Sequence, residues 1–125
     1  MNQTRQLIVV IEDDDGLGRA LQRLLRMSGF DSLLFDSAET YVAAGSTPAP
    51  HCLILDVQLP GASGPQYYEH LHHPKPPAVF ITSHDNPATR KLVATAGGRE
   101  LLIKPFVAKD LFDAISRETL GHSTS

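Results

Sequence analysis

The sequence has one cysteine, no long apolar run and no excess of positive charge, and each of these limits the candidate classes. Cys52 cannot form an intramolecular disulfide, and its position in the apolar run 52–55 favours a buried structural thiol. No stretch approaches the roughly 18 apolar residues of a membrane span, and the first residues lack the apolar core of a signal peptide. A net charge of −3 gives no sign of a nucleic-acid partner. We therefore expect a cytoplasmic protein whose present segment binds neither membranes nor nucleic acid.

Short aliphatic runs alternate with stretches of helical spacing along the 125 residues, which predicts one domain of five strand–helix units. Strands are expected at the following runs: 7–11, 30–35, 52–55, 79–81 and 101–103. Helices are expected over the following stretches: 17 to the Ser28-Gly29 stop, 38–44, after Ser63-Gly64-Pro65, from Asn86-Pro87 to about 97, and 108–119. The domain should cover 6–120, with 121–125 as a polar tail or the start of a linker.

The composition of the strands indicates their order in the sheet. Continuous aliphatic runs are typical of strands covered on both faces, so the first and third strands belong in the middle. The second strand contains Asp31 and Ser32 and suits an edge. A flavodoxin-like α/β fold, doubly wound with a parallel sheet in the order 2-1-3-4-5, satisfies both conditions. Ligands of such sheets bind beyond the carboxyl ends of the strands, where the first and third strands meet.

Acidic side chains follow these two central strands directly. Glu12 and Asp13 come after the first strand, and Asp56 comes after the third, so the three should converge at one end of the sheet. Asp14 and Asp15 are better explained as carboxylates at a helix N-terminus. Two carboxylates about 4 Å apart repel by about 4 kcal/mol at an effective dielectric near 20, so a cluster of three should bind a cation or a proton. All-oxygen ligands favour Mg²⁺, or Mn²⁺, over zinc.

Two further polar residues end the fourth and fifth strands. Thr82 follows 79–81, and Lys104 follows 101–103, so both side chains can reach the acidic site. A helix-capping hydroxyl and a surface cation are the plainer explanations for them. A lysine and a hydroxyl beside an acidic metal site are, however, suited to binding phosphate.

The sequence resembles the receiver domain of bacterial two-component response regulators, the CheY-like family, over about residues 6–120. The resemblance rests on four segments in order: Glu12-Asp13, Asp56-Val-Gln-Leu-Pro-Gly-Ala-Ser-Gly64, Ile81-Thr82-Ser83, and Ala96-Gly97-Gly98 followed by Lys104-Pro105-Phe106. It implies that Asp56 accepts a phosphoryl group from a histidine kinase or a phosphotransfer protein, and that the chain is otherwise no enzyme, apart from dephosphorylating itself. Asp13, Asp56 and the backbone carbonyl of Gln58 would bind Mg²⁺, with Glu12 acting through water.

The resemblance also implies that Thr82 bonds the bound phosphoryl group, that Lys104 pairs with it, and that the Lys104–Pro105 peptide is cis. Two residues depart from the family pattern: Glu12 replaces the commoner aspartate, and Leu101 replaces a Phe or Tyr. Without that aromatic switch, we expect the signal to travel through the loop 83–87 and the following helix. The fourth helix, fifth strand and fifth helix form the expected partner or homodimer face. Charged residues expected on that face are Arg90, Lys91, Arg99, Glu100 and Lys109.

Other readings remain open or are set aside. The serious alternative is a binding module of receiver architecture that signals without phosphorylation, which Leu101 favours and the Asp13–Asp56–Lys104 set opposes. A flavin carrier is disfavoured because acidic residues follow the first strand, and an aspartate phosphatase because Gln58 stands where a second aspartate is usual. Gln58 and His84 are equally well explained as surface residues or as modulators of dephosphorylation. Residues expected to be solvated or packed, without metal or ligand, are His70, His72, His73, Tyr67 and Tyr68.

Overall fold

The structure is a computed structural model that describes residues 5–45 and 47–123, with side chains described as far as Leu120. Strands and helices alternate along the chain. The elements in order are β1 (Leu7–Ile11), α1 (Asp15–Met27), β2 (Asp31–Phe35), α2 (Ala38–Ala43), β3 (Cys52–Asp56), α3 (Gly64–Glu69), β4 (Ala78–Thr82), α4 (Pro87–Thr95), β5 (Glu100–Ile103) and α5 (Ala108–Ser123). The predicted five strand–helix units are confirmed.

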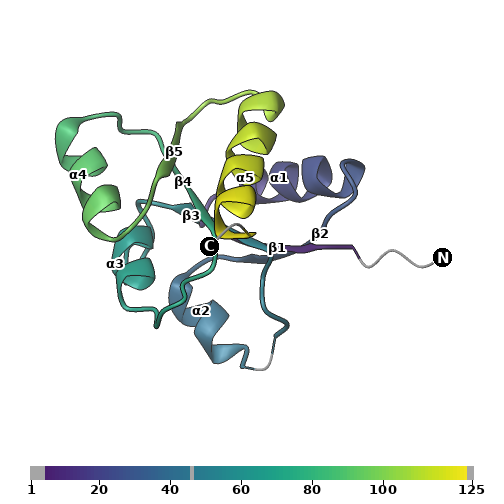
Figure 1. Ribbon diagram of the computed structural model, residues 1–125, viewed down its shortest axis with the longest axis horizontal. Coiled ribbons are helices and arrows are strands. Elements are labelled where there is room, and N and C mark those ends of the chain that lie inside the picture. Colours follow the sequence, from purple (N-terminus) through teal and green to yellow (C-terminus); the bar gives the residue numbers. More distant parts are fainter. Residues whose placement is uncertain (1–4, 46, 124–125) are drawn as a thin grey trace.

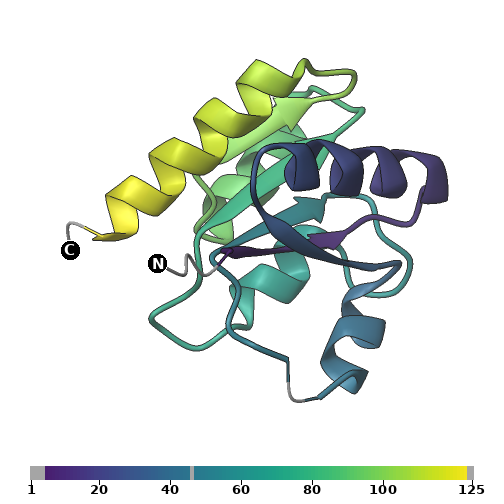
Figure 2. The same ribbon diagram turned by 90° about the vertical axis from the view of Figure 1, so that its right-hand side faces the viewer.

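The five strands form one parallel sheet in the order β2-β1-β3-β4-β5, as predicted. Helices α1 and α5 cover one face, and α2, α3 and α4 cover the other (Figures 1 and 2). Each face has its own apolar core, with Leu21 of α1 and Leu111 of α5 on the first, and Tyr68 of α3 and Val93 of α4 on the second. The central strands β1 and β3 are buried along almost their whole length, whereas β2 is half-buried at the edge. This burial explains why the aliphatic runs could be read as central strands.

Short-range bonds begin and end the helices near the predicted residues. Asp14 caps α1 by accepting a hydrogen bond from the backbone N–H of Leu17 at 3.1 Å, as expected for an acidic residue there. Gly29, with φ of 93°, closes the same helix in the left-handed region. Ser63 and Gln66 form a reciprocal capping box at the start of α3. These caps place the start of each helix just beyond the strand end that bears polar residues.

The last helix differs from its prediction. α5 continues to Ser123, past the expected end near Thr119, so residues 121–123 of the predicted tail are helical. A glycine inside a helix costs only about 1 kcal/mol, so Gly121 does not end the helix. Residues 124 and 125 of the predicted tail lie outside the described residues. Along the described chain, no helix is both long and apolar enough to cross a bilayer.

Two ion pairs join α5 to the start of β5. Arg117 binds Glu100 through two hydrogen bonds of 2.9 and 2.8 Å. Arg99, directly before β5, lies 3.3 Å from the carboxylate of Glu118, which is 5% exposed. The earlier residue of the β5 couple, Arg99, pairs with the later residue of the α5 couple, Glu118, so the two ion pairs lie side by side, as between antiparallel segments. They hold α5 at the end of β5 that is farther from the acidic residues.

Candidate functional site

The predicted acidic residues converge at the carboxyl ends of β1 and β3. These strands are hydrogen-bonded neighbours with Ile11 opposite Leu55, so Glu12 and Asp56 end up side by side. Carboxylate oxygens of Glu12, Asp13 and Asp56 all lie within 4.8 Å of one another. Glu12 and Asp56 are 2% and 3% exposed, whereas Asp13 is exposed to solvent. The cluster therefore has a buried floor and one ligand reachable from water.

Lys104 is the counter-charge of this cluster. Its Nζ donates a hydrogen bond to Glu12 Oε1 at 2.8 Å and another to Asp56 Oδ2 at 2.6 Å. The lysine is aimed by the sheet, because its backbone N–H donates to the carbonyl oxygen of Thr82 at 2.7 Å. The prediction that this ammonium reaches back over the sheet end is confirmed. The Lys104–Pro105 peptide is cis, as the family resemblance implied.

Burial and the neighbouring charges shift the pKa values of two of these groups. Burial raises the pKa of Glu12, and the Asp56 carboxylate adds to this, while Lys104 and the backbone N–H of Asp14 act in the opposite direction. For Lys104, burial alone would lower the pKa, but the bonds to Asp56 and Glu12 outweigh it and raise the pKa. The lysine is therefore charged at neutral pH, and Glu12 is the carboxyl that holds a proton more readily than usual.

Thr82 lies at the site but makes a bond that the sequence did not predict. The residue has no solvent exposure, and its hydroxyl donates to Gln58 Oε1 at 3.0 Å. The hydroxyl oxygen of Thr82, Oγ1, also accepts a hydrogen bond from the backbone N–H of His84 at 3.0 Å. Gln58 is also anchored beside Asp56, because its backbone N–H donates to Asp56 Oδ1 at 2.9 Å. Gln58 thus takes part through its side chain as well as its backbone, and its bond to Thr82 is a contact that the sequence did not predict.

Gly64 allows the main chain at the start of α3 to approach the main chain at the end of β3. A Cβ atom on this glycine would collide with the backbone carbonyl oxygen of Asp56 and approach the Leu55 side chain at 3.5 Å. The backbone N–H of Gly64 donates to the carbonyl of Val57 at 3.2 Å, which holds the start of α3 against the end of β3. Glycine is required here because two stretches of main chain touch.

The acidic cluster fits a divalent metal ion. It offers oxygen ligands only, from Glu12, Asp13 and Asp56, which is the donor set that Mg²⁺ and Mn²⁺ prefer. When these groups are ionised, Lys104 offsets one of the three carboxylate charges, so two remain for a divalent ion. A surface hollow of about 370 Å³ is lined in part by Glu12, Asp13 and Asp36, so two of the three carboxylates border it.

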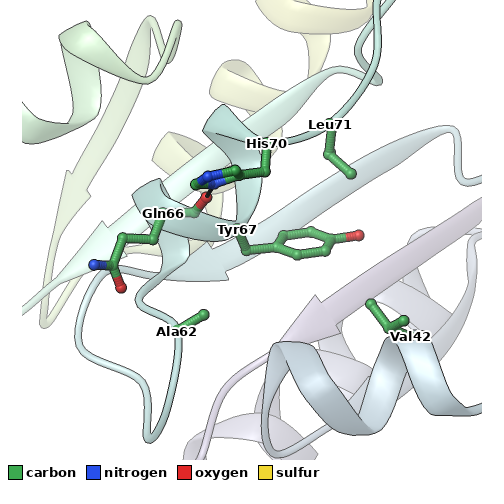
Figure 3. Close-up of a pocket in the computed structure, with 6 residues that line it drawn as sticks. All are labelled: Val42, Ala62, Gln66, Tyr67, His70 and Leu71. Carbon is green, nitrogen blue, oxygen red and sulfur yellow. Dashed lines mark hydrogen bonds between the residues drawn. The ribbon is translucent and has the colours of Figure 1, made fainter.

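Another hollow lies between α2 and α3, with a volume of about 470 Å³ (Figure 3). The ring of Tyr67 points into it from α3, opposite Val42 of α2. Burial raises the pKa of Tyr67 to about 12, so it stays neutral. Tyr68 is buried and donates its hydroxyl hydrogen to the carbonyl of Pro76 at 2.6 Å. The prediction that both tyrosines pack is confirmed, and within the described part of the chain no histidine joins a group of three potential metal ligands.

Comparison with known proteins identifies the family. The profile of the response regulator receiver domain matches residues 8–116, nearly all of the chain. The chain belongs to this family. Receiver domains accept a phosphoryl group in two-component signalling, which agrees with the acidic cluster at the end of the sheet.

Relatives of this receiver domain include full response regulators. The nodulation protein W of Bradyrhizobium diazoefficiens is 35% identical over 93% of the chain and 52% of that protein. The response regulator protein TmoT of Ectopseudomonas mendocina is 34% identical over 92% of the chain and 53% of that protein. The chain thus spans about half the length of these curated relatives.

Solved structures of receiver domains agree in fold. A response regulator receiver protein from Burkholderia phymatum is 36% identical and has a TM-score of 0.77 over 94% of the chain and 96% of that protein. A CheY-like receiver domain protein from Methanospirillum hungatei has a TM-score of 0.87 over 97% of the chain and 98% of that protein. The second is 18% identical, so its likeness is one of fold.

Proposed function

We propose that Asp56 is the residue of this receiver domain that accepts the phosphoryl group. The observation that carries the proposal is the environment of its carboxylate, which is buried at the end of a central strand yet bonded to Lys104 and adjacent to Glu12 and Asp13. A carboxylate oxygen of Asp56 would form the new bond to phosphorus as the bond to the donor's imidazole nitrogen breaks. The donor would be a histidine kinase or a phosphotransfer protein.

The surrounding groups have distinct roles in this proposal. Lys104 neutralises charge on Asp56 before transfer and can follow the phosphoryl oxygens afterwards, since its ammonium is already 2.6 Å from Asp56 Oδ2. Thr82 supplies a hydroxyl hydrogen for a phosphoryl oxygen. Asp13, Asp56 and the Gln58 carbonyl would hold Mg²⁺ or Mn²⁺, with Glu12 acting through water. The bound ion supplies charge neutralisation for the transferred group, as in phosphoryl transfer generally.

Labelling with a small phosphodonor tests this assignment. The purified protein, with acetyl phosphate and Mg²⁺, should gain one acid-labile phosphate by mass spectrometry, and Asp56→Asn should gain none. Asp36→Asn is the matched control, because Asp36 is an exposed aspartate near the site whose carboxylate bonds Thr40 instead. EDTA should stop labelling of the parent. Full labelling of Asp56→Asn would refute the acceptor, and labelling undiminished by EDTA would refute the metal.

We also propose that the face formed by α4, β5 and α5 is the output or homodimer surface. Its support is apolar exposure, with Leu92 of α4 and Val107 before α5 at 55% and 62%. The charged residues expected there largely pair within the chain. The pairs are Arg90 with Asp85, Arg99 with Glu118, Glu100 with Arg117, and Lys109 with Asp113. Apolar contact should therefore dominate, and phosphorylation should change the sedimentation mass of the parent more than that of Leu92→Asp.

A further inference from the structure

The hydroxyl of Thr82 has one proton, and that proton is already in use. The hydroxyl donates it to Gln58 Oε1 at 3.0 Å, in a residue with no solvent exposure. A threonine hydroxyl is a single donor with two acceptor lone pairs. The amide oxygen of Gln58 accepts but cannot donate, so the direction of this bond is fixed. Thr82 cannot donate to a phosphoryl oxygen while it donates to Gln58.

We propose that the Gln58–Thr82 hydrogen bond holds the receiver in its unphosphorylated arrangement, and that Gln58 is a positioning residue which must release Thr82 for signalling. This inference rests on the proposed function, because it needs a phosphoryl group on Asp56. The bond joins two segments 24 residues apart, the loop after β3 and the end of β4. The bond therefore connects the loop that follows Asp56 to Thr82 and the loop 83–87, the segment expected to move.

The loop beyond β4 is attached to the same oxygen. The backbone N–H of His84 donates to Thr82 Oγ1 at 3.0 Å, so the position of the hydroxyl sets the position of the start of that loop. On the other side, the backbone of Gln58 is tied to Asp56 Oδ1 at 2.9 Å, which leaves only its side chain free to turn away. Gln58 is exposed, so its released amide can bond water with little loss of packing.

Charge gives the exchange its direction. The amide oxygen of Gln58 is a neutral acceptor, whereas phosphoryl oxygens are anionic and form hydrogen bonds roughly twice as strong. Before phosphorylation the hydroxyl has the amide as its partner. Once phosphoryl oxygens are present beside Asp56, the same proton has a stronger acceptor. The β4–α4 loop then follows Thr82 through its bond from His84.

Removing the amide without changing the length of the side chain tests the inference. Gln58→Met keeps the backbone bond to Asp56 and lacks an acceptor for Thr82. Gln6→Met is the matched control, because Gln6 is also exposed and lies at the opposite end of β1. Binding of beryllofluoride with Mg²⁺, measured by amide NMR titration, should be roughly 2- to 10-fold tighter in Gln58→Met, the range that one net hydrogen bond spans. The control should match the parent.

Two further readouts separate release of Thr82 from a general change in structure. Without ligand, amide signals of residues 82–85 in Gln58→Met should move from the free parent positions toward the beryllofluoride-bound ones. In a Thr82→Val background, Gln58→Met should leave the affinity unchanged, because no hydroxyl remains to be released. Unchanged or weaker affinity in Gln58→Met beside a responsive parent would overturn this inference alone. A parent that does not respond to beryllofluoride would overturn the proposed function and this inference with it.

Discussion

Replacing Lys104 by methionine measures how far the stability of the site depends on this ammonium group. The ammonium lies 2.8 Å from Glu12 Oε1 and 2.6 Å from Asp56 Oδ2, and the two carboxylate side chains are 0% and 4% exposed. Removing one partner of a fully buried pair costs about 3–5 kcal/mol, because a buried charge is left uncompensated. The Lys104 side chain is 20% exposed, so water can enter in its place. We therefore expect a loss of about 2–3 kcal/mol at pH 7 without Mg²⁺.

Thermal and urea unfolding, followed by circular dichroism, give the assay. A loss of this size should lower the melting temperature by roughly 8–12 °C, since about 1 kcal/mol corresponds to roughly 4 °C for a domain of this length. Lys109→Met is the matched control. Lys109 lies 2.7 Å from Asp113, a similar distance, but its side chain is 81% exposed. The control should unfold close to the parent, because solvent screens exposed ion pairs.

Metal and pH should change the deficit of Lys104→Met in predictable directions. At the proposed site Mg²⁺ would bind the folded state and offset the carboxylate charge, so it should narrow the difference in stability between Lys104→Met and the parent. Burial raises the pKa of Glu12, so this carboxyl favours the folded state when protonated, and that contribution is lost as the pH rises through its folded-state pKa. The deficit should therefore also narrow as the pH falls from 7 toward 4.5, the ordinary value for glutamate. A Lys104→Met protein as stable as the parent at pH 7 without metal would refute this reasoning.

Other substitutions test the remaining contacts. Gly64→Ala should cost about 1–3 kcal/mol in urea unfolding, because its Cβ would collide with the Asp56 carbonyl. Gly16→Ala is its control. Gly16 lies in α1 and an added Cβ would come no closer than 3.4 Å to the Asp14 side chain, so this substitution should be neutral or stabilising. Without metal, Asp13→Asn should raise the melting temperature by a few degrees, because it removes a repulsion of about 1 kcal/mol from carboxylates within 4.8 Å. The same substitution should weaken Mg²⁺ binding, measured by calorimetry. A lowered melting temperature in Asp13→Asn would mean that this carboxylate mainly makes structural bonds.

The sequence predicted the positions of the site residues because their side chains follow strands directly. Parallel strands bring their carboxyl ends to one edge, so Glu12, Asp56, Thr82 and Lys104 could be placed together from strand composition alone. The order of the strands followed from the aliphatic runs in the centre and the polar residues in β2. Where the position of a residue is set by the order and direction of the strands, the pattern of apolar and polar residues was sufficient to predict it.

Side-chain partners were less predictable. The Thr82–Gln58 bond depends on side-chain torsions at two residues 24 positions apart, for which the sequence holds no periodic signal. Arg99 and Glu100 were expected to face a partner, yet each forms an ion pair with α5. The sequence did not show which side of this helix faces β5, so these pairs could not be predicted. The end of α5 was predicted near Thr119, whereas the helix continues to Ser123, because the polar residues after Leu120 do not by themselves break a helix.

The two ion pairs between β5 and α5 have a mechanical consequence. Arg99 with Glu118 and Glu100 with Arg117 fasten the two elements at the end of β5 distant from Asp56. Sliding α5 along β5 by one residue would bring like charges together, so the ion pairs oppose translation of the helix along the strand. The other end of β5 leads to Lys104, whose backbone is bonded to Thr82. A displacement of the Thr82 backbone would thus reach the end of β5 near Lys104, while the ion pairs hold the other end of the strand to α5.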